Sequence, residues 1–359
     1  MTPLRVTVCV PLTDDPTAAV LAAVGSSGVD HEVEVRYEPD LLAPQRFPAD
    51  HRGDPTFVRG PAQQERWDGL LSTTDVALGI PGDGPDGLRQ LVRAAPGLRW
   101  VQGTAAGTGE QLLAAGWSTE QLTGIRVTSA AGLHAEPLTE FALSGLLALL
   151  KDHDVLRRAS SERQWLPRWP MRQLAGSTVA VLGMGGIGRR LAEVLHALGA
   201  EVVAVRRRPE AFSDGSSETV SRTVGLDDLD GILPQVDAVV STLPGTPATR
   251  GLLDAGRLAL LPPHAVVVNV GRGSVVDSAA LVAALDAGRL RGAALDVTDV
   301  EPLPADSPLW GRPDVVLSPH TAALTAEEDR KIIALFADNL ARFLSGLPMR
   351  NLVDPAHGY

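Results

Sequence analysis

A glycine turn near the middle of the chain limits what this sequence can fold into. An apolar run, Val179–Leu182, leads into the letters GMGGIG, and a helix candidate and a second apolar run, Glu201–Val205, follow. The glycines therefore have G-x-G-x-x-G spacing between a strand and a helix, in a βαβ unit of about thirty residues. A phosphate reaches the backbone only where side chains are absent, and a helix N-terminus offers N–H donors. We predict that a dinucleotide diphosphate binds at Gly183, Gly185 and Gly188.

The residues after the second strand bear on the form of this dinucleotide. In NAD-binding units an acidic residue at this place accepts hydrogen bonds from the adenosine ribose. This chain has Arg206, Arg207 and Arg208 there instead, and Val202–Arg208 contains no carboxylate. Guanidinium groups bind phosphate through forked, charge-assisted hydrogen bonds. We therefore expect NADP(H) to be the preferred cofactor and NAD(H) the alternative. The plainer interpretation is that these arginines only form a solvated, basic strand end.

Size and charge exclude several classes of protein. The chain has 359 residues, 44% of them hydrophobic, and a formal net charge of −11, which disfavours binding to nucleic acid or an anionic membrane. Its one cysteine, Cys9, cannot form an internal disulfide, and no signal-peptide core follows Met1. The apolar stretch Phe141–Leu150 is too short to span a bilayer. We therefore expect a cytoplasmic protein without nucleic-acid or membrane partners.

Alternating strand and helix patterns predict an α/β protein with two doubly wound parallel sheets and a cleft between the domains. The strands expected in the first domain are Val6–Val10, Glu32–Tyr37, Val76–Ile80, Arg99–Val101 and Arg126–Thr128. Six strands are expected in the second: Val179–Leu182, Glu201–Val205, Ala238–Ser241, Ala265–Val270, Gly292–Asp296 and Val315–Leu317. The polar stretch Asp40–Asp68 is predicted to be a long loop or an insertion.

The last helix candidate, Ala326–Gly346, follows the sixth strand and is expected to return to the first domain. This makes the first domain discontinuous. We assign residues 1–132 plus 324–359 to a substrate-binding domain and residues 133–323 to a dinucleotide-binding domain. The charged segment Lys151–Arg172 carries Trp165 and Trp169 and is expected to pack across a domain or subunit boundary.

Arg272, Glu301 and His320 follow expected strands of the second domain. Ligands of open α/β sheets bind beyond the carboxyl ends of strands, so these residues should converge. A cation can bind a carboxylate and polarise a carbonyl, an imidazole can protonate its oxygen, and a carboxylate can hold that imidazole. Taken alone, the histidine is more often structural, the glutamate is usually a turn residue, and the arginine usually forms a surface pair. Beside a dinucleotide turn, the set predicts hydride transfer.

Other chemistries lack their motifs. No cysteine pair or H-E-x-x-H spacing indicates a metal site, so we expect none. No G-x-S-x-G elbow indicates a serine hydrolase.

The chain resembles the D-isomer-specific 2-hydroxyacid dehydrogenase family in the glycine turn and three further motifs: VNVGRGSVVD (Val268–Asp277), ALDVTDVEPLPADSPLW (Ala294–Trp310) and SPHTA (Ser318–Ala322). The resemblance implies that Arg272 binds substrate, that Glu301 pairs with the catalytic histidine, and that His320 is this histidine. It also implies a cofactor site that, besides the three turn glycines, comprises Gly186, Ile187, Arg206, Arg207, Leu243, Pro244, Val270, Asp296, His320 and Ala322. Arg206 is similar to the NADP-preferring glyoxylate/hydroxypyruvate reductase branch.

The segment Trp100–Gly109 resembles the family loop whose backbone N–H groups hold the substrate carboxylate. The resemblance implies substrate-binding roles for Thr104, Ala105, Ala106 and Gly107. Ala105 stands where the family often has glycine, and Gly109 where it often has aspartate. We expect the added methyl group to restrict the turn and the missing aspartate to remove a helix cap. His134 is predicted to be structural.

Taken together, these features predict NAD(P)H-dependent, reversible reduction of a small 2-oxo acid to the D-2-hydroxy acid, with the substrate's side chain left open. The resemblance also implies a homodimer formed through Glu136–Trp169. Two alternatives remain open: a phosphite-type dehydrogenase, which keeps the Arg–Glu–His set, and a dinucleotide-sensing binding protein similar to corepressors of this fold. A formate dehydrogenase is disfavoured, because those relatives carry Gln at the position of Glu301.

Overall fold

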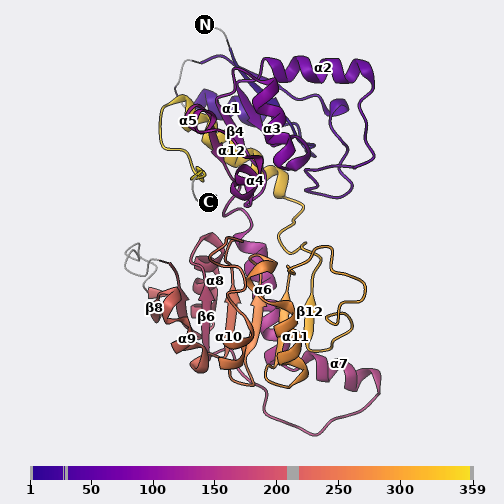
Figure 1. Ribbon diagram of the computed structural model, residues 1–359, viewed down its shortest axis with the longest axis vertical. Coiled ribbons are helices and arrows are strands. Elements are labelled where there is room, and N and C mark those ends of the chain that lie inside the picture. Colours follow the sequence, from indigo (N-terminus) through magenta and orange to yellow (C-terminus); the bar gives the residue numbers. More distant parts are fainter. Residues whose placement is uncertain (1–2, 27, 29–30, 208–217, 356–359) are drawn as a thin grey trace. The chain divides into compact units, whose positions relative to one another are not determined.

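The computed structural model describes residues 3–26, 28, 31–207 and 218–355, so Arg208 lies outside the described residues. The chain forms two compact units (Figure 1). Unit 1 comprises Met1–Leu133 and Leu324–Tyr359, and unit 2 comprises His134–Ala323. Each unit contains one sheet in which every strand pairing is parallel. The predicted fold class of two parallel-sheet α/β domains is confirmed.

The sheet of unit 1 has the order β2-β1-β3-β4-β5. Its strands are β1 (Leu4–Val8), β2 (Val33–Arg36), β3 (Val76–Leu78), β4 (Trp100–Gln102) and β5 (Arg126–Thr128). The strand order reverses between β1 and β3, which is where open α/β sheets place ligands, beyond the carboxyl ends of the strands. The loops that follow β3 and β4 both lie at the carboxyl ends of the strands, which we call the ligand-binding edge of the sheet.

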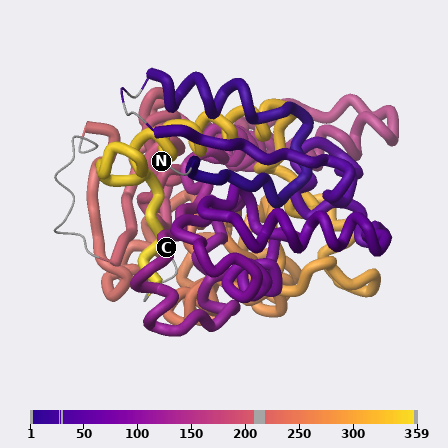
Figure 2. Tube along the Cα trace, turned by 90° about the horizontal axis from the view of Figure 1, so that it is seen from above, coloured from indigo at the N-terminus to yellow at the C-terminus, as the bar shows by residue number. Residues whose placement is uncertain are grey.

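Helices of unit 1 cover its sheet. They are α1 (Thr17–Ser26), α2 (Pro61–Ser72), α3 (Pro85–Ala94), α4 (Thr108–Ala115), α5 (Thr119–Gly124) and α12 (Glu328–Leu344). Helix α12 comes from the far end of the sequence and packs beside α1, as the indigo and yellow tubes in Figure 2 show. The ring of Trp100 on β4 stacks on Phe336 of α12 with centroids 4.9 Å apart. This contact buries both rings and ties the C-terminal segment into unit 1.

The prediction of one long loop over Asp40–Asp68 is wrong, because α2 begins inside it at Pro61. Proline suits the first turn of a helix, where its missing N–H is not needed. The side-chain oxygen of Gln63 accepts a hydrogen bond from the N–H of Gly60 at 3.0 Å and so satisfies one of the donors at the start of the helix. Trp67 and Leu71 are buried under this helix. The high Pro and Gly content of the segment obscured this local start signal.

The sheet of unit 2 has the order β12-β11-β10-β9-β6-β7-β8. Its strands are β6 (Thr178–Leu182), β7 (Glu201–Val205), β8 (Arg222–Val224), β9 (Ala238–Ser241), β10 (Val266–Asn269), β11 (Gly292–Leu295) and β12 (Val315–Leu317). The prediction of six strands is wrong by one, since β8 pairs with β7 at the sheet edge. A three-residue edge strand that starts with an exposed arginine has no apolar run to reveal it.

Helices lie on both faces of the unit 2 sheet. They are α6 (Ala135–Leu150), α7 (His153–Ser161), α8 (Gly186–Ala197), α9 (Leu229–Ile232), α10 (Ala255–Leu260) and α11 (Ser278–Asp286). Alternate residues of a strand face opposite sides. Val179 and Val181 therefore join the core under α6 and α8, whereas Ala180 and Leu182 join the core under α9, α10 and α11. Within the described residues, no helix is long and apolar enough to cross a membrane.

Candidate active site

The glycine turn of unit 2 joins β6 to α8. Gly183 has φ of +96°, a conformation that side chains disfavour. A Cβ on Gly188 would lie 1.9 Å from the carbonyl oxygen of Gly183, so only glycine allows this close approach of helix and strand. By contrast, a Cβ on Gly185 would meet no atom within 4 Å. Gly185 therefore leaves open space directly in front of the first turn of α8.

This geometry fits a dinucleotide diphosphate. Helix α8 begins at Gly186 and includes Ile187 in its first turn, so the N–H groups at its positive end are close to the open space beside Gly185. Arg206 and Arg207 follow β7, which is the strand after this helix. Arg206 is half-buried, and its backbone N–H donates to the carbonyl oxygen of Val224 on β8 at 3.1 Å. Arg207 is exposed. The second strand thus ends in two cations at the place where NAD-binding units have a carboxylate.

His320 and Glu301 form a hydrogen-bonded pair. The Nδ1 atom of His320 lies 2.8 Å from Oε2 of Glu301, and Oε1 of Glu301 accepts a hydrogen bond from the N–H of Thr298 at 3.0 Å. Both side chains of the pair are partly exposed, 46% for the histidine and 38% for the glutamate. Because Nδ1 is engaged, Nε2 is the ring nitrogen left to act on a ligand. A carboxylate in this position fixes the orientation of the ring.

The backbone at His320 has φ of +55°, which is rare for a residue with a side chain. Its N–H donates to the carbonyl oxygen of Asp296 at 2.9 Å. The buried Asp296 side chain supports the same loop, because its Oδ1 accepts hydrogen bonds from the hydroxyl of Ser318 and the N–H groups of Thr321 and Ala322, at 2.7, 3.1 and 3.0 Å. Such strain persists only where the surroundings hold it, and it is frequent at functional sites.

Arg272 follows β10 in the motif VNVGRG. The side chain of buried Asn269 shapes this loop: its Nδ2 donates to the carbonyl oxygen of Arg272 at 2.9 Å, and its Oδ1 accepts from the N–H of Gly271 at 3.1 Å. The Nη1 of Arg272 donates to the carbonyl oxygen of Gly271 at 3.0 Å. A Cβ on Gly245 would lie 3.3 Å from Cγ of Arg272, so the arginine passes close to the loop that follows β9.

The strand order brings the three predicted catalytic residues to one edge of unit 2. Arg272 follows β10, Glu301 follows β11 and His320 follows β12, and these strands are neighbours in the sheet. Parallel strands lie about 4.8 Å apart, so their carboxyl ends share this edge. Further predicted cofactor residues lie at the same carboxyl ends. Leu243 and Pro244 follow β9, Val270 follows β10, and Ala322 follows β12.

The predicted substrate loop lies in unit 1, between β4 and α4. The carbonyl oxygen of Ala105 accepts hydrogen bonds from the Thr108 hydroxyl at 2.7 Å and from the N–H of Ala130 at 3.1 Å. The φ of Ala105 is not positive, so its methyl group stands on a backbone conformation that side chains tolerate. The N-cap of α4 is Gly107, and Gly109 is the second residue of the helix, so the expectation that Gly109 occupies the cap position is wrong. In the described structure, no hydrogen bond uses the N–H of Ala106 or Gly107 as donor.

Some contributors to these loops were missed by sequence reasoning. They are Asn269, Ser318 and Thr242. The hydroxyl of Thr242 donates to the carbonyl oxygen of Gly183 at 3.0 Å. Their common signal is a polar residue within or just after an apolar strand.

His134, predicted to be structural, is the N-cap of α6. No group of three or more His, Cys, Asp or Glu side chains suited to a metal ion occurs in the part of the chain that the structure describes.

The chain is similar to proteins of one known family. Residues 143–322 match the family described as "D-isomer specific 2-hydroxyacid dehydrogenase, NAD binding domain". Glyoxylate/hydroxypyruvate reductase A of Salmonella newport is 33% identical over 224 residues, which cover 62% of this chain and 69% of that protein.

Two solved structures are similar along nearly the whole chain. A D-isomer specific 2-hydroxyacid dehydrogenase from Xanthobacter autotrophicus Py2, in complex with NADPH and MES, is 31% identical with a TM-score of 0.73 and covers 100% of both chains. The NADPH-dependent glyoxylate/hydroxypyruvate reductase from Sinorhizobium meliloti, in complex with NADP and sulfate, is 29% identical with a TM-score of 0.73 and covers 99% of both chains.

Proposed function

The chain belongs to the D-isomer specific 2-hydroxyacid dehydrogenase family, and from this premise we propose that it reduces small 2-oxo acids to D-2-hydroxy acids with NADPH. The observation that carries the proposal is the hydrogen bond between Nδ1 of His320 and Oε2 of Glu301 at 2.8 Å. It leaves Nε2 of a carboxylate-supported imidazole at the ligand-binding edge of the sheet. The proposed catalytic residues are Arg272, Glu301 and His320.

His320 acts as the general acid in this proposal. When bound, the reduced nicotinamide supplies the hydride that reduces the carbonyl carbon. As negative charge develops on the carbonyl oxygen, the imidazolium donates its Nε2 proton to that oxygen. Glu301 stabilises the imidazolium before this transfer and holds the ring afterwards, through the same Nδ1 hydrogen bond. In the reverse direction, the neutral imidazole accepts the hydroxyl proton.

Two groups are proposed to bind the substrate carboxylate and orient the carbonyl. The guanidinium of Arg272 provides charge-assisted hydrogen bonds and polarises the carbonyl group. The backbone N–H groups of the loop Thr104–Gly107 provide neutral donors, in agreement with the way the carbonyl of Ala105 is turned into the protein. We propose that residues 1–132 with 324–359 form the substrate-binding domain and that residues 133–323 form the cofactor-binding domain, which also supplies Arg272 to the substrate.

The cofactor preference rests on the two cations after β7. Arg206 and Arg207 are proposed to bind the 2′-phosphate of NADP(H), and the turn Gly183–Gly188 to bind the diphosphate. The complexes of the Xanthobacter and Sinorhizobium relatives contain NADPH and NADP, respectively, which supports this choice. Leu243, Pro244, Val270, Asp296 and Ala322 are proposed to border the remainder of the cofactor. NAD(H) is the weaker cofactor in this proposal.

A homodimer completes the proposal. Helix α7 and the segment after it carry large apolar side chains on the surface: Leu156 is 40% exposed and Trp165 is fully exposed. Exposed aromatic residues are enriched in protein interfaces. We assign the enzyme to the cytoplasm, a reducing compartment in which the buried free thiol of Cys9 stays reduced.

The decisive experiment is an initial-rate screen of NADPH oxidation against glyoxylate, hydroxypyruvate, pyruvate and bulkier 2-oxo acids, with NADH as the paired cofactor. The proposal expects turnover of at least one small 2-oxo acid and a higher kcat/KM with NADPH. Tight NADPH binding without turnover of any member of the panel would instead indicate a cofactor-sensing protein. NADP⁺ reduction by phosphite in a parallel assay would indicate the phosphite branch.

A further inference from the structure

The loop after β3 in unit 1 has an unusual backbone. Gly82 has φ of +65°, and Asp83, which has a side chain, has φ of +45°. Asp and Asn tolerate this left-handed conformation better than other residues, but it still carries a conformational cost. A hydrogen bond from the N–H of Asp83 to the carbonyl oxygen of Ile80 at 2.8 Å closes the turn. The turn therefore holds one carboxylate in a defined place at the ligand-binding edge of this sheet.

The side chain of Asp83 points to the neighbouring loop. Its Oδ1 accepts a hydrogen bond from the hydroxyl of Thr104 at 3.4 Å and one from Nε2 of Gln111 at 3.5 Å. The same amide of Gln111 donates to the backbone carbonyl of Asp83 at 3.1 Å. Thr104 is the first residue of the proposed carboxylate-binding loop, and Gln111 lies on the helix that follows it. Asp83 is thus fixed against that loop from the adjacent strand end.

The charge of Asp83 is not compensated by its contacts. Both side chains that bond to its carboxylate, Thr104 and Gln111, are neutral. The nearby acid Asp86 differs, because its side chain is 98% exposed and pairs with Arg89. A partly buried carboxylate next to the proposed anion-binding loop repels a second anionic group on the same ligand and accepts hydrogen bonds from a hydroxyl group.

From this arrangement we infer that Asp83 determines which side chain the substrate carries: it favours 2-oxo acids with a hydroxyl on C3 and disfavours those with a second carboxylate. The inference rests on the proposed function, since it takes the loop Thr104–Gly107 as the site of the first carboxylate. Asp83 has no part in the proton transfer assigned to His320. Its replacement should therefore change the choice among substrates and leave turnover of a 2-oxo acid without a side chain nearly unchanged.

Two replacements separate the two effects without disturbing the turn. Asp83→Asn removes the charge, keeps the side-chain oxygen and tolerates positive φ, so it should raise kcat/KM for oxaloacetate about tenfold relative to glyoxylate. Asp83→Gly removes the acceptor and suits the backbone conformation, so it should lower kcat/KM for hydroxypyruvate about tenfold relative to glyoxylate, which corresponds to one hydrogen bond. Asp86→Asn makes the same change of charge on an exposed neighbour and serves as the control.

The measurement is kcat/KM for glyoxylate, pyruvate, hydroxypyruvate and oxaloacetate with NADPH, for wild type and the three variants. Substrate ratios that move in both Asp83 variants but not in Asp86→Asn support the inference. Ratios that stay at wild-type values in both Asp83 variants, while the enzyme remains active, overturn it and leave the proposed function intact. A wild-type protein inactive on all 2-oxo acids overturns the proposed function and the inference together.

Discussion

His320 and Glu301 are 19 positions apart in the chain, yet Nδ1 of the imidazole lies 2.8 Å from Oε2 of the carboxylate. The two residues follow neighbouring parallel strands, β12 and β11, and so reach the same sheet edge from different crossovers. A second pair of a histidine and an acidic residue lies at the amino ends of the strands of the same sheet. His264, which precedes β10, lies with Nε2 2.9 Å from Oδ1 of Asp237. Only the first pair lies where ligands of such sheets bind.

Replacing His320 by alanine should lower kcat by a factor of about one hundred or more, because proton transfer loses its positioned acid. The dissociation constant for NADPH, measured by fluorescence titration, should stay close to wild type. His264→Ala is the matched control, since it removes a histidine from an acid pair at the other edge. Equal losses of kcat in the two variants would contradict the catalytic role of His320.

Replacing Glu301 by glutamine should lower kcat about tenfold or more while the ring remains held, because an amide oxygen can accept the Nδ1 hydrogen bond but does not stabilise the imidazolium by charge. Stopped-flow single-turnover measurements with NADPH and glyoxylate would show whether the reduction step itself slows. A glutamine variant with wild-type single-turnover rates would show that the carboxylate charge is dispensable.

Replacing Arg206 by alanine should raise the dissociation constant for NADPH about tenfold and leave that for NADH nearly unchanged, because one charge-assisted contact to the 2′-phosphate is lost. Isothermal titration with both cofactors measures the difference. Arg190→Ala is the control for loss of a cation elsewhere in unit 2, as this arginine of α8 pairs with Glu136 and Glu193. Equal weakening of NADPH and NADH binding by Arg206→Ala would show that Arg206 does not bind the 2′-phosphate.

The stability of unit 1 should depend on Asp329 at acid pH. Burial of Asp329 alone raises its pKa, but hydrogen bonds from His51 and Thr13 outweigh burial and lower the pKa to about 2. A carboxyl group with a lowered folded-state pKa stabilises the fold above its unfolded value, near 3.9, and loses this contribution as pH falls toward 2. Asp329→Asn should therefore cost about 2 kcal/mol at pH 7.

Urea unfolding at pH 7, 4 and 2.5 tests this expectation, and the difference between wild type and Asp329→Asn should shrink as the pH falls. Asp14→Asn is the control, because Asp14 pairs with Arg330 on the surface, where ion pairs contribute little. A stability difference that is the same at all three pH values would show that the charge of Asp329 does not contribute.

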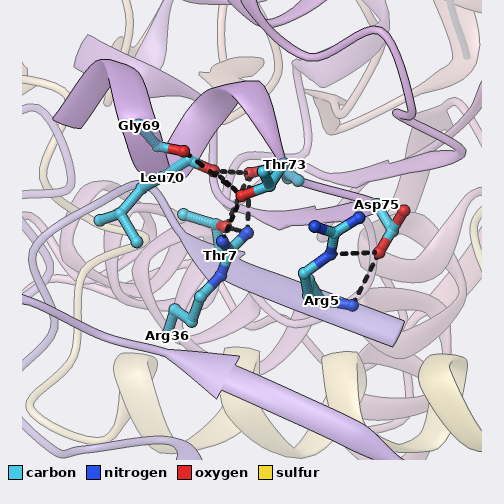
Figure 3. Close-up of polar contacts among 8 residues, drawn as sticks. Arg5, Thr7, Arg36, Gly69, Leu70, Thr73 and Asp75 are labelled. Atoms are coloured by element: carbon cyan, nitrogen blue, oxygen red, sulfur yellow. Dashed lines mark hydrogen bonds and ion pairs between the residues drawn. The ribbon is translucent and has the colours of Figure 1, made fainter. Parts of the chain in front are cut away.

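A second stability prediction concerns Arg36, whose contacts are drawn in Figure 3. Its guanidinium donates to the hydroxyls of Thr73 and Thr7 at 2.7 Å each, and Thr73 in turn donates to carbonyl oxygens of the last turn of α2. The cation thereby lies near the negative end of that helix. Burial lowers the pKa of Arg36, because the guanidinium loses part of its hydration in the folded protein.

Arg36→Met keeps much of the side-chain volume but removes the donors, and should cost about 2 kcal/mol of unfolding free energy. Arg66→Met provides the comparison on α2 itself. Arg66 pairs with Asp40 at 2.8 Å on the exposed side, and its loss should cost less than about 0.5 kcal/mol. Chemical denaturation of the two variants gives both values, and a cost at Arg36 no larger than that at Arg66 would contradict the role assigned to it.

The sequence alone determined the class of fold, and it supplied the residues that we propose as the reacting groups. The spacing of Gly183, Gly185 and Gly188 predicts a strand–turn–helix unit because only glycine permits the close approach that the turn requires, and this constraint is local. Apolar runs such as Glu201–Val205 predicted strands because the hydrophobic pattern of a strand is also a local property of the sequence. Local signals were also the source of error: the prolines of the segment that contains Pro61 concealed a helix, and β8 was too short and polar to be recognised.

Only the tertiary structure decided which side chains meet. The order of strands in a sheet follows from how crossovers pack on its two faces, and no short window of sequence contains that information. This packing brings Glu301 to His320, gives Asp296 its hydrogen bonds to the loop Ser318–Ala322, and sets Asp83 against Thr104. These are contacts between residues distant in the chain, formed because the cores beneath them fix their backbones, and the chemistry proposed for this protein depends on them.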